Sequence, residues 1–166
     1  MLVNLFYMTL MLSILLCALV AGLVFGFAVV VMPGIAKLSN REFLLAFKHM
    51  DGIIQNNQPA FMLVWVGSVF SIIAVLVLGT LHLVGSQLYL LWVASALYLL
   101  AVQLPTVRFN IPLNNTLQAL STDALSESEL GKARADFEGP WNFWNRFRTL
   151  NALVSVSALL LLLLLV

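Results

Sequence analysis

The stretch LFYMTLMLSILLCALVAGLVFGFAVVVM, residues 5–32, contains no charged side chain. The hydrocarbon core of a bilayer is about 30 Å thick, and a helix needs about 20 apolar residues to cross it. The stretch is longer than the core of a secretion signal, and residues 1–10 lack the basic flank that such a signal carries. We therefore predict a retained transmembrane helix over residues 5–32 that ends at Pro33.

Three further apolar stretches follow, at residues 59–81, 88–107 and 147–166. They are unbroken runs of Leu, Val, Ile and Ala, whereas the strands of a membrane β-barrel alternate between apolar and polar residues. Only 9% of the chain is charged, against about 25% in soluble domains. The sequence predicts an all-α integral membrane protein, a four-helix transmembrane bundle that forms one domain over residues 1–166.

The charged residues predict how this bundle is oriented. All eight basic and all seven acidic residues lie in two stretches, Lys37–Asp51 and Arg108–Arg148. The positive-inside rule then places segments 33–58 and 108–146 in the cytoplasm and both termini outside. We expect a multi-pass protein of a plasma membrane, such as a bacterial inner membrane, surrounded by membrane lipid. A net charge of +1 gives no reason to expect a nucleic-acid partner.

Short interfacial helices are expected in both cytoplasmic segments. Ser39 and Glu42 have the spacing of a capping box at the start of a helix over 39–55. Ser126 and Glu129 repeat this capping-box spacing before a polar helix over about 127–137, which is expected to end at the glycine and proline of positions 139–140. The expected helix over 39–55 has an apolar side, formed by Phe43, Phe47, Met50 and Ile54. The opposite, charged side is expected to hold Arg41, Lys48 and Asp51.

The remaining reactive residue types exclude several classes of membrane enzyme. Cys17 is the only cysteine, so a two-cysteine redox centre is excluded. His49 and His82 are expected on opposite membrane faces, which argues against paired haem ligands and against a zinc or copper site. No acidic residue lies within a predicted span, which argues against a proton-coupled exporter. His49 is the candidate general base on the cytoplasmic face.

Polar clusters adjoin three of the predicted spans at one depth. They contain Asn56, Asn57 and Gln58; Asn110, Asn114 and Asn115; and Trp141, Asn142, Asn145 and Arg148. At about 100° per residue, Trp141, Trp144, Asn145 and Arg148 share one side of the fourth helix. These residues form either a network that caps and locks the helices or a pocket for a flat aromatic molecule that carries oxygen atoms.

Several groups of residues occur in order along nearly the whole chain. They are AGLVFG (21–26) with Met32 and Pro33; QNNQPAFM (55–62); NIPLNN (110–115); Phe137 with Glu138; Pro140, Trp141 and Asn142; and Arg148 with Thr149. In this combination the chain resembles the anthrone oxygenase-like family of small four-helix membrane proteins, most of which have no known function.

The resemblance implies an activity as well as a fold. Family members from fungal polyketide pathways oxidise an anthrone to the anthraquinone with molecular oxygen. Those members share a Pro-x-Asn motif after the third helix and a Trp-Asn…Arg motif at the fourth. The matching residues here are Pro112 with Asn114, and Trp141 and Asn142 with Arg148. The fungal pattern has a histidine three residues before that arginine, where this chain has Asn145.

An anthrone anion can transfer an electron directly to oxygen, so we expect no metal and no other cofactor. On this interpretation the substrate is a lipophilic aromatic molecule of anthrone or quinol type. Arg148 would stabilise the oxyanion, Asn114 and Asn145 would orient the substrate, Trp141 and Trp144 would stack on it, and His49 would act as base. Asn57, Asn110 and Asn142 are further candidates for contact with the substrate.

Two alternatives remain open at this point. The same cluster can serve a non-catalytic membrane protein that binds a lipid, a small molecule or a partner helix. Separately, Ala18, Gly22 and Gly26 recur at intervals of four residues, a pattern of close helix approach. This pattern predicts either packing within the bundle or a homo-oligomer through Gly22 and Gly26.

Overall fold

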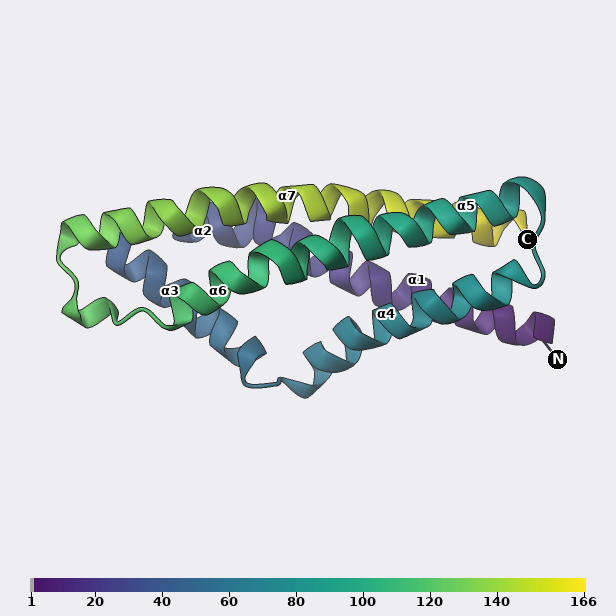
Figure 1. Cartoon of the computed structure of the whole chain (residues 1–166), viewed down its shortest axis with the longest axis horizontal. Helices are drawn as coiled ribbons and strands as arrows, with labels where there is room; N and C mark the ends of the chain where they lie inside the picture. The colour runs from purple at the N-terminus through teal and green to yellow at the C-terminus, as the bar shows by residue number, and fades with distance from the viewer. Residues whose placement is uncertain (1) are drawn as a thin grey trace.

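The computed structural model describes residues 2–166, which are almost entirely helical and include no strand (Figure 1). The helices are α1 (Leu2–Gly26), α2 (Met32–Ile35), α3 (Asn40–Gln55), α4 (Pro59–Thr80), α5 (Gly85–Ala96), α6 (Ile111–Gln118) and α7 (Glu127–Leu165). Three π-helical turns, η1 (Phe27–Val31), η2 (Leu97–Gln103) and η3 (Thr106–Asn110), and one 3₁₀ turn, η4 (Thr122–Ala124), complete the chain.

Four continuous helices are long and apolar enough to cross a membrane, namely Val3–Ile35, Pro59–Thr80, Gly85–Gln118 and Glu127–Leu165. α1 packs along both α4 and α7, and α5 packs against α7. The two termini lie at one end of the bundle, while α3 and α6 lie toward the other (Figure 1). The predicted all-α, four-helix integral membrane architecture is confirmed.

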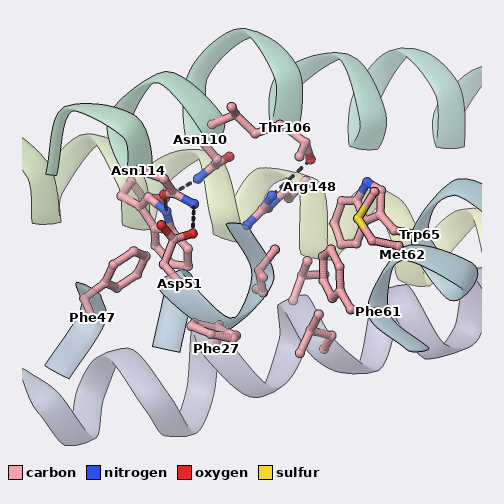
Figure 2. Close-up of a pocket in the computed structure, with 15 residues that line it drawn as sticks. Phe27, Phe47, Asp51, Phe61, Met62, Trp65, Thr106, Asn110, Asn114 and Arg148 are labelled. Atoms are coloured by element: carbon pink, nitrogen blue, oxygen red, sulfur yellow. Dashed lines mark hydrogen bonds between the residues drawn. The ribbon is translucent and has the colours of Figure 1, made fainter. Parts of the chain in front are cut away.

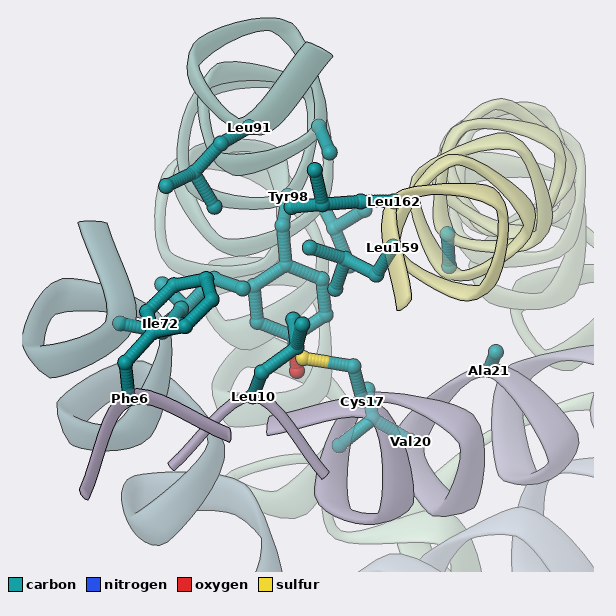
Figure 3. Packing of buried hydrophobic residues seen from close by; sticks show 14 of the residues in the cluster. Phe6, Leu10, Cys17, Val20, Ala21, Ile72, Leu91, Tyr98, Leu159 and Leu162 are labelled. Atoms are coloured by element: carbon teal, nitrogen blue, oxygen red, sulfur yellow. The ribbon is translucent and has the colours of Figure 1, made fainter. Parts of the chain in front are cut away.

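An apolar core fills the half of the bundle nearest the termini (Figure 3). Leu10, Ile72 and Leu159, from three different helices, are completely buried in it. Cys17 is buried in the same cluster. The Tyr98 hydroxyl donates a hydrogen bond of 2.6 Å to Ser68 Oγ, so the largest polar group in this core is satisfied inside the protein.

Three helix ends differ from those expected. The first helix continues past Pro33 to Ile35. The third helix does not end near residue 107 but runs on to Gln118. α7 is not broken at Pro140, which lies inside it. A proline removes one backbone hydrogen bond, but here the residues on either side of Pro140 are held by tertiary packing, which supplies most helix stability in proteins.

That packing forms a second apolar cluster, beneath α3. Phe47 contacts both Phe137 and Trp141 edge to face, with ring centroids 4.6 and 5.2 Å apart. The predicted apolar side of α3 is thus confirmed at Phe43 and Phe47, which are buried. The two capping boxes, at Ser39 and Ser126, are also present as predicted.

The glycines of the first helix do not pack within the chain. A Cβ added to Gly22 or Gly26 would meet no atom within 4 Å. The expectation that they allow close packing against another helix of the bundle is therefore wrong. The homo-oligomer through this surface stays a prediction.

Candidate functional site

A cavity of about 230 Å³ lies where α3 folds over the bundle, between α1, α3, α4, α6 and α7 (Figure 2). Its lining is Leu23, Val24, Phe27, Phe47, Asp51, Ile54, Phe61, Met62, Trp65, Thr106, Asn110, Ile111, Asn114, Trp141 and Arg148. Pockets for drug-sized ligands occupy roughly 300–1,000 Å³, so this one suits a compact ligand. Most of the lining is apolar or aromatic, and two charged side chains interrupt it.

The first charged side chain, Arg148, is 94% buried, with 6% of its surface exposed. Its Nη1 donates to Thr106 Oγ1 over 3.0 Å, and its Nε and Nη2 donate to Asn145 Oδ1 over 3.1 and 2.9 Å. Both partners are neutral. Within residues 2–166, Arg148 forms no salt bridge to a carboxylate. A guanidinium has five N–H donors, so two remain for a ligand.

Asn145 holds the guanidinium in place. This amide is 1% exposed, and its Nδ2 donates to the backbone oxygen of Val24 over 3.0 Å. Its oxygen is thereby turned toward Arg148, one helical turn further along α7. Asn145 does not itself line the cavity, so its role is to orient Arg148 and to connect α7 to α1.

The second charged side chain is Asp51, which the sequence interpretation placed on the charged outer side of α3. That placement is wrong, because Asp51 is 4% exposed and lines the cavity. Its Oδ1 accepts from Asn114 Nδ2 over 2.7 Å, and its Oδ2 accepts from Gln55 and Gln118 Nε2, each over 2.8 Å. Asp51 lies four residues after Phe47, a spacing that puts both on one helix face. This four-residue spacing is the feature of the sequence that indicates a buried position for Asp51.

Two amides and an indole connect the cavity walls. Asn114 Oδ1 accepts a hydrogen bond of 2.8 Å from Trp141 Nε1, so Asn114 joins Trp141 to Asp51. Asn110 Nδ2 donates to the Trp141 backbone oxygen over 3.3 Å. The buried Oδ1 of Asn110 has no hydrogen-bond partner. Asn110 belongs to the cavity lining, so an unsatisfied acceptor lies in that wall.

The backbone around Asn110 explains why these side chains share one wall. Thr106, Asn110 and Asn114 are spaced four residues apart, and η3 spans the first interval. In a regular α-helix such a series drifts around the axis by about 40° at each step. A π-helical turn is wider, and such turns occur frequently at functional sites. The wide turn counteracts the drift and keeps the series facing the cavity.

Four of the residues predicted for the site lie elsewhere. His49 is exposed on α3, and Asn57 is exposed in the turn before α4, where it adopts a positive φ of 57°. Asn142 is partly buried but does not line the cavity. Trp144 stacks on Phe109 with ring centroids 3.7 Å apart, in a shallow groove on the outside of the bundle. The structure brings together Arg148, Asn114, Asn110, Trp141 and, behind them, Asn145.

The donor set of the cavity is narrow. Asp51 is the only acid in the lining, which includes no histidine and no cysteine. Among residues 2–166, no three His, Cys, Asp or Glu side chains are grouped as metal ligands would be.

The fold and the cavity define an integral membrane four-helix bundle with a buried polar site at one end of its apolar core. Within that class, the chain belongs to the anthrone oxygenase family, whose model matches residues 47–158. The matched range contains the part of α3 from Phe47 onward, which supplies Asp51, and the part of α7 that supplies Trp141 and Arg148. Comparison with curated proteins gave no match, and comparison with solved structures gave none either.

Proposed function

We propose that the protein oxidises a lipophilic aromatic substrate of anthrone or quinol type with molecular oxygen, and that it does so in the cavity at Arg148. Family membership supports the reaction type. The observation that carries the proposal is the buried Arg148 guanidinium, which has neutral partners only and lines a largely apolar cavity. Such a group stabilises negative charge that develops on a substrate oxygen.

The chemistry balances without a resident cofactor. Loss of a proton from the CH₂ group of an anthrone leaves an anion whose charge is shared with the carbonyl oxygen across the central ring. This anion reduces O₂, a carbon–oxygen bond forms, and the resulting peroxide loses the second C–H proton as its O–O bond breaks. The sum is anthrone plus O₂ giving anthraquinone plus water. Arg148 would donate hydrogen bonds to this carbonyl oxygen while the charge resides there.

The position of Arg148 along α7 suits a substrate dissolved in the membrane. Arg148 precedes Leu165, the end of α7, by 17 residues (165 − 148), or about 26 Å at ~1.5 Å per residue. Since the hydrocarbon core is about 30 Å thick, Arg148 would lie near the boundary on the side of α3. We place that side in the cytoplasm and the protein in a plasma membrane, because all charged residues gather there.

Oxygen uptake by the purified protein tests this proposal. With an anthrone as substrate, the rate should exceed spontaneous autoxidation, and Arg148→Ala should lower it by about 100-fold or more, as loss of an oxyanion-stabilising donor does. Arg146→Ala is the matched control, because Arg146 lies two residues away and is exposed. The metal content of the same sample should be substoichiometric. Uptake no faster than autoxidation would refute the proposal.

A second candidate function is binding without catalysis, of a lipid, a small molecule or a partner helix. The observation in its favour is that Arg148, Asn145 and the Val24 backbone form a connected network between α7 and α1. A network of this kind can simply lock the bundle. In that case Arg148→Ala would lower thermal stability in detergent while the protein consumed no oxygen before or after the change.

A further inference from the structure

We infer that Asp51 is the group that accepts the proton from the substrate carbon. This role rests on the proposed oxidation and adds to it the base that the reaction requires. Asp51 and Arg148 both line the cavity, and both are more than nine-tenths buried. Asp51 comes from α3, the helix that closes the cavity, whereas Arg148 comes from α7 (Figure 2). A ligand between them would meet a carboxylate and a guanidinium on different walls.

The hydrogen bonds of Asp51 leave it able to accept a proton. All three donors, from Asn114, Gln55 and Gln118, are neutral amides at 2.7–2.8 Å. A carboxylate offers about four acceptor positions, so one position on Oδ1 stays free. Within residues 2–166 Asp51 forms no salt bridge. Its negative charge is therefore solvated by amide N–H groups and not neutralised by a cation.

No other cavity residue can perform this step. The lining contains two titratable side chains, Asp51 and Arg148, and an arginine stays protonated in proteins. His49, the base expected from the sequence, is exposed and does not line the cavity. The position in α7 where the fungal pattern has a histidine holds Asn145, whose oxygen already accepts from Arg148.

The proton transfer moves charge within the cavity without adding any. A substrate C–H bond breaks, an O–H bond forms at Asp51 Oδ1, and the electron pair stays on the substrate. Delocalisation then shifts that pair to the carbonyl oxygen of the substrate, beside Arg148. Because the number of charges in the buried site is unchanged, the step avoids the large cost of creating a new unpaired charge there. Without oxygen the transfer is reversible, and the substrate exchanges hydrogen with water through Asp51.

Anaerobic hydrogen exchange tests the inference separately from oxidation. Anthrone is mixed with the purified protein in D₂O buffer under nitrogen, and deuterium in its CH₂ group is followed by NMR. The wild-type protein should accelerate exchange over buffer alone. Asp51→Asn should slow the protein-dependent exchange by about 100-fold or more, the usual contribution of a general base. Asp123→Asn is the control, because the Asp123 side chain is 99% exposed.

Two further variants exclude a purely structural effect. Asp51→Glu keeps a carboxylate and should retain measurable exchange. Asp51→Ala should be restored in part by added formate, because formate can occupy the vacated space and accept the proton. A residue that only connected α3 to α6 would not be replaced by a free carboxylate. Failure of formate to restore exchange in Asp51→Ala, with exchange also lost in Asp51→Glu, would therefore refute the inference.

The outcomes for the two proposals are distinct. If the wild type exchanges hydrogen and Asp51→Asn does not, Asp51 is the proton acceptor even where oxygen uptake is absent, and the oxidation alone is refuted. If oxygen uptake is present but exchange is equal in wild type and Asp51→Asn, the role of Asp51 is refuted and the oxidation stands. If the wild type gives no exchange above buffer, the inference about Asp51 is wrong.

Discussion

Arg148 and Asp51 line one cavity but do not form an ion pair with each other. Each is buried, and each is held by neutral hydrogen-bond partners, among them Asn114 for Asp51 and Thr106 for Arg148. A direct salt bridge would satisfy both charges, yet the two stay apart across the cavity. The cost of burying them separately is high, so the arrangement favours a ligand that contacts both.

The geometry of the guanidinium should matter as much as its charge. Arg148→Lys keeps a positive charge but replaces a planar guanidinium, with its fixed set of N–H donors, by a compact ammonium group. A lysine ammonium cannot bond Thr106 and Asn145 as the guanidinium does. We expect kcat for anthrone oxidation to fall by about 100-fold, with thermal stability also reduced. Steady-state oxygen uptake measures this, and Arg146→Lys should behave like the wild type.

Asn145 should contribute mainly to stability. Asn145→Ala removes the acceptor of Arg148 and the hydrogen bond to Val24 O, leaving a buried charged group short of a partner. The expected cost is about 1–3 kcal/mol, measured by thermal or denaturant unfolding in detergent. Asn142→Ala, three residues earlier, should cost less than Asn145→Ala, because Asn142 is only partly buried and does not line the cavity. Equal effects of the two variants would contradict the role assigned to Asn145.

The start of α3 should loosen in acid. Hydrogen bonds from the Ser39 hydroxyl and backbone N–H lower the pKa of Glu42 below its ordinary value of 4.5. A lowered pKa in the folded state stabilises the cap above pH 4.5, and this contribution is lost as the pH falls through the lower, folded value. The protection of amides in the first turn of α3, measured as the exchange rate relative to the intrinsic rate at each pH, should therefore fall below pH 4.5. Glu42→Gln should abolish that pH dependence, and an unchanged profile would be evidence against the cap.

The outward surface of the first helix should mediate self-association. Gly22 and Gly26 lie four residues apart, and a Cβ added at either would meet no atom within 4 Å, which leaves a surface suited to close helix approach. We expect a homo-oligomer, and a shift toward monomer in Gly22→Leu and Gly26→Leu. Light scattering coupled to size exclusion in detergent measures the change. A wild type that is already monomeric would show that this surface faces lipid only.

The four spans and both helix caps could be predicted because each depends on local sequence. Long uncharged runs are decided by bilayer thickness, and a capping box is decided by residues three apart. The continuation of two helices past Pro33 and Pro140 could not be predicted, because it depends on packing between distant segments. The rings of Phe47 and Trp141, which pack together one residue away from the exposed Pro140, lie 94 residues apart along the chain (141 − 47).

The candidate site could be predicted only in part. Arg148, Asn110, Asn114 and Trp141 were identified because such residues are costly at the edge of a membrane unless they have partners. Asp51 could not be predicted for the cavity from its residue type, because a charged residue is expected on the polar side of a helix. Its position four residues after Phe47 nevertheless places it on the buried side. Trp144 was assigned to the cavity because it is near Trp141 on the helix, but the ring of Phe109 holds it on the outside. Which neighbour captures an aromatic ring cannot be read from one helix alone.

The rim of the cavity has a kinetic consequence. Leu23, Met62 and Ile111 line the cavity and are still 37%, 37% and 42% exposed. They belong to helices long and apolar enough to cross a membrane, so we expect their outer surfaces to face lipid. A substrate arriving past them competes with lipid or detergent and not with bulk water. The rate should therefore depend on the mole fraction of substrate in the membrane phase. Adding detergent at constant total substrate should raise the apparent KM expressed per volume and slow turnover by surface dilution.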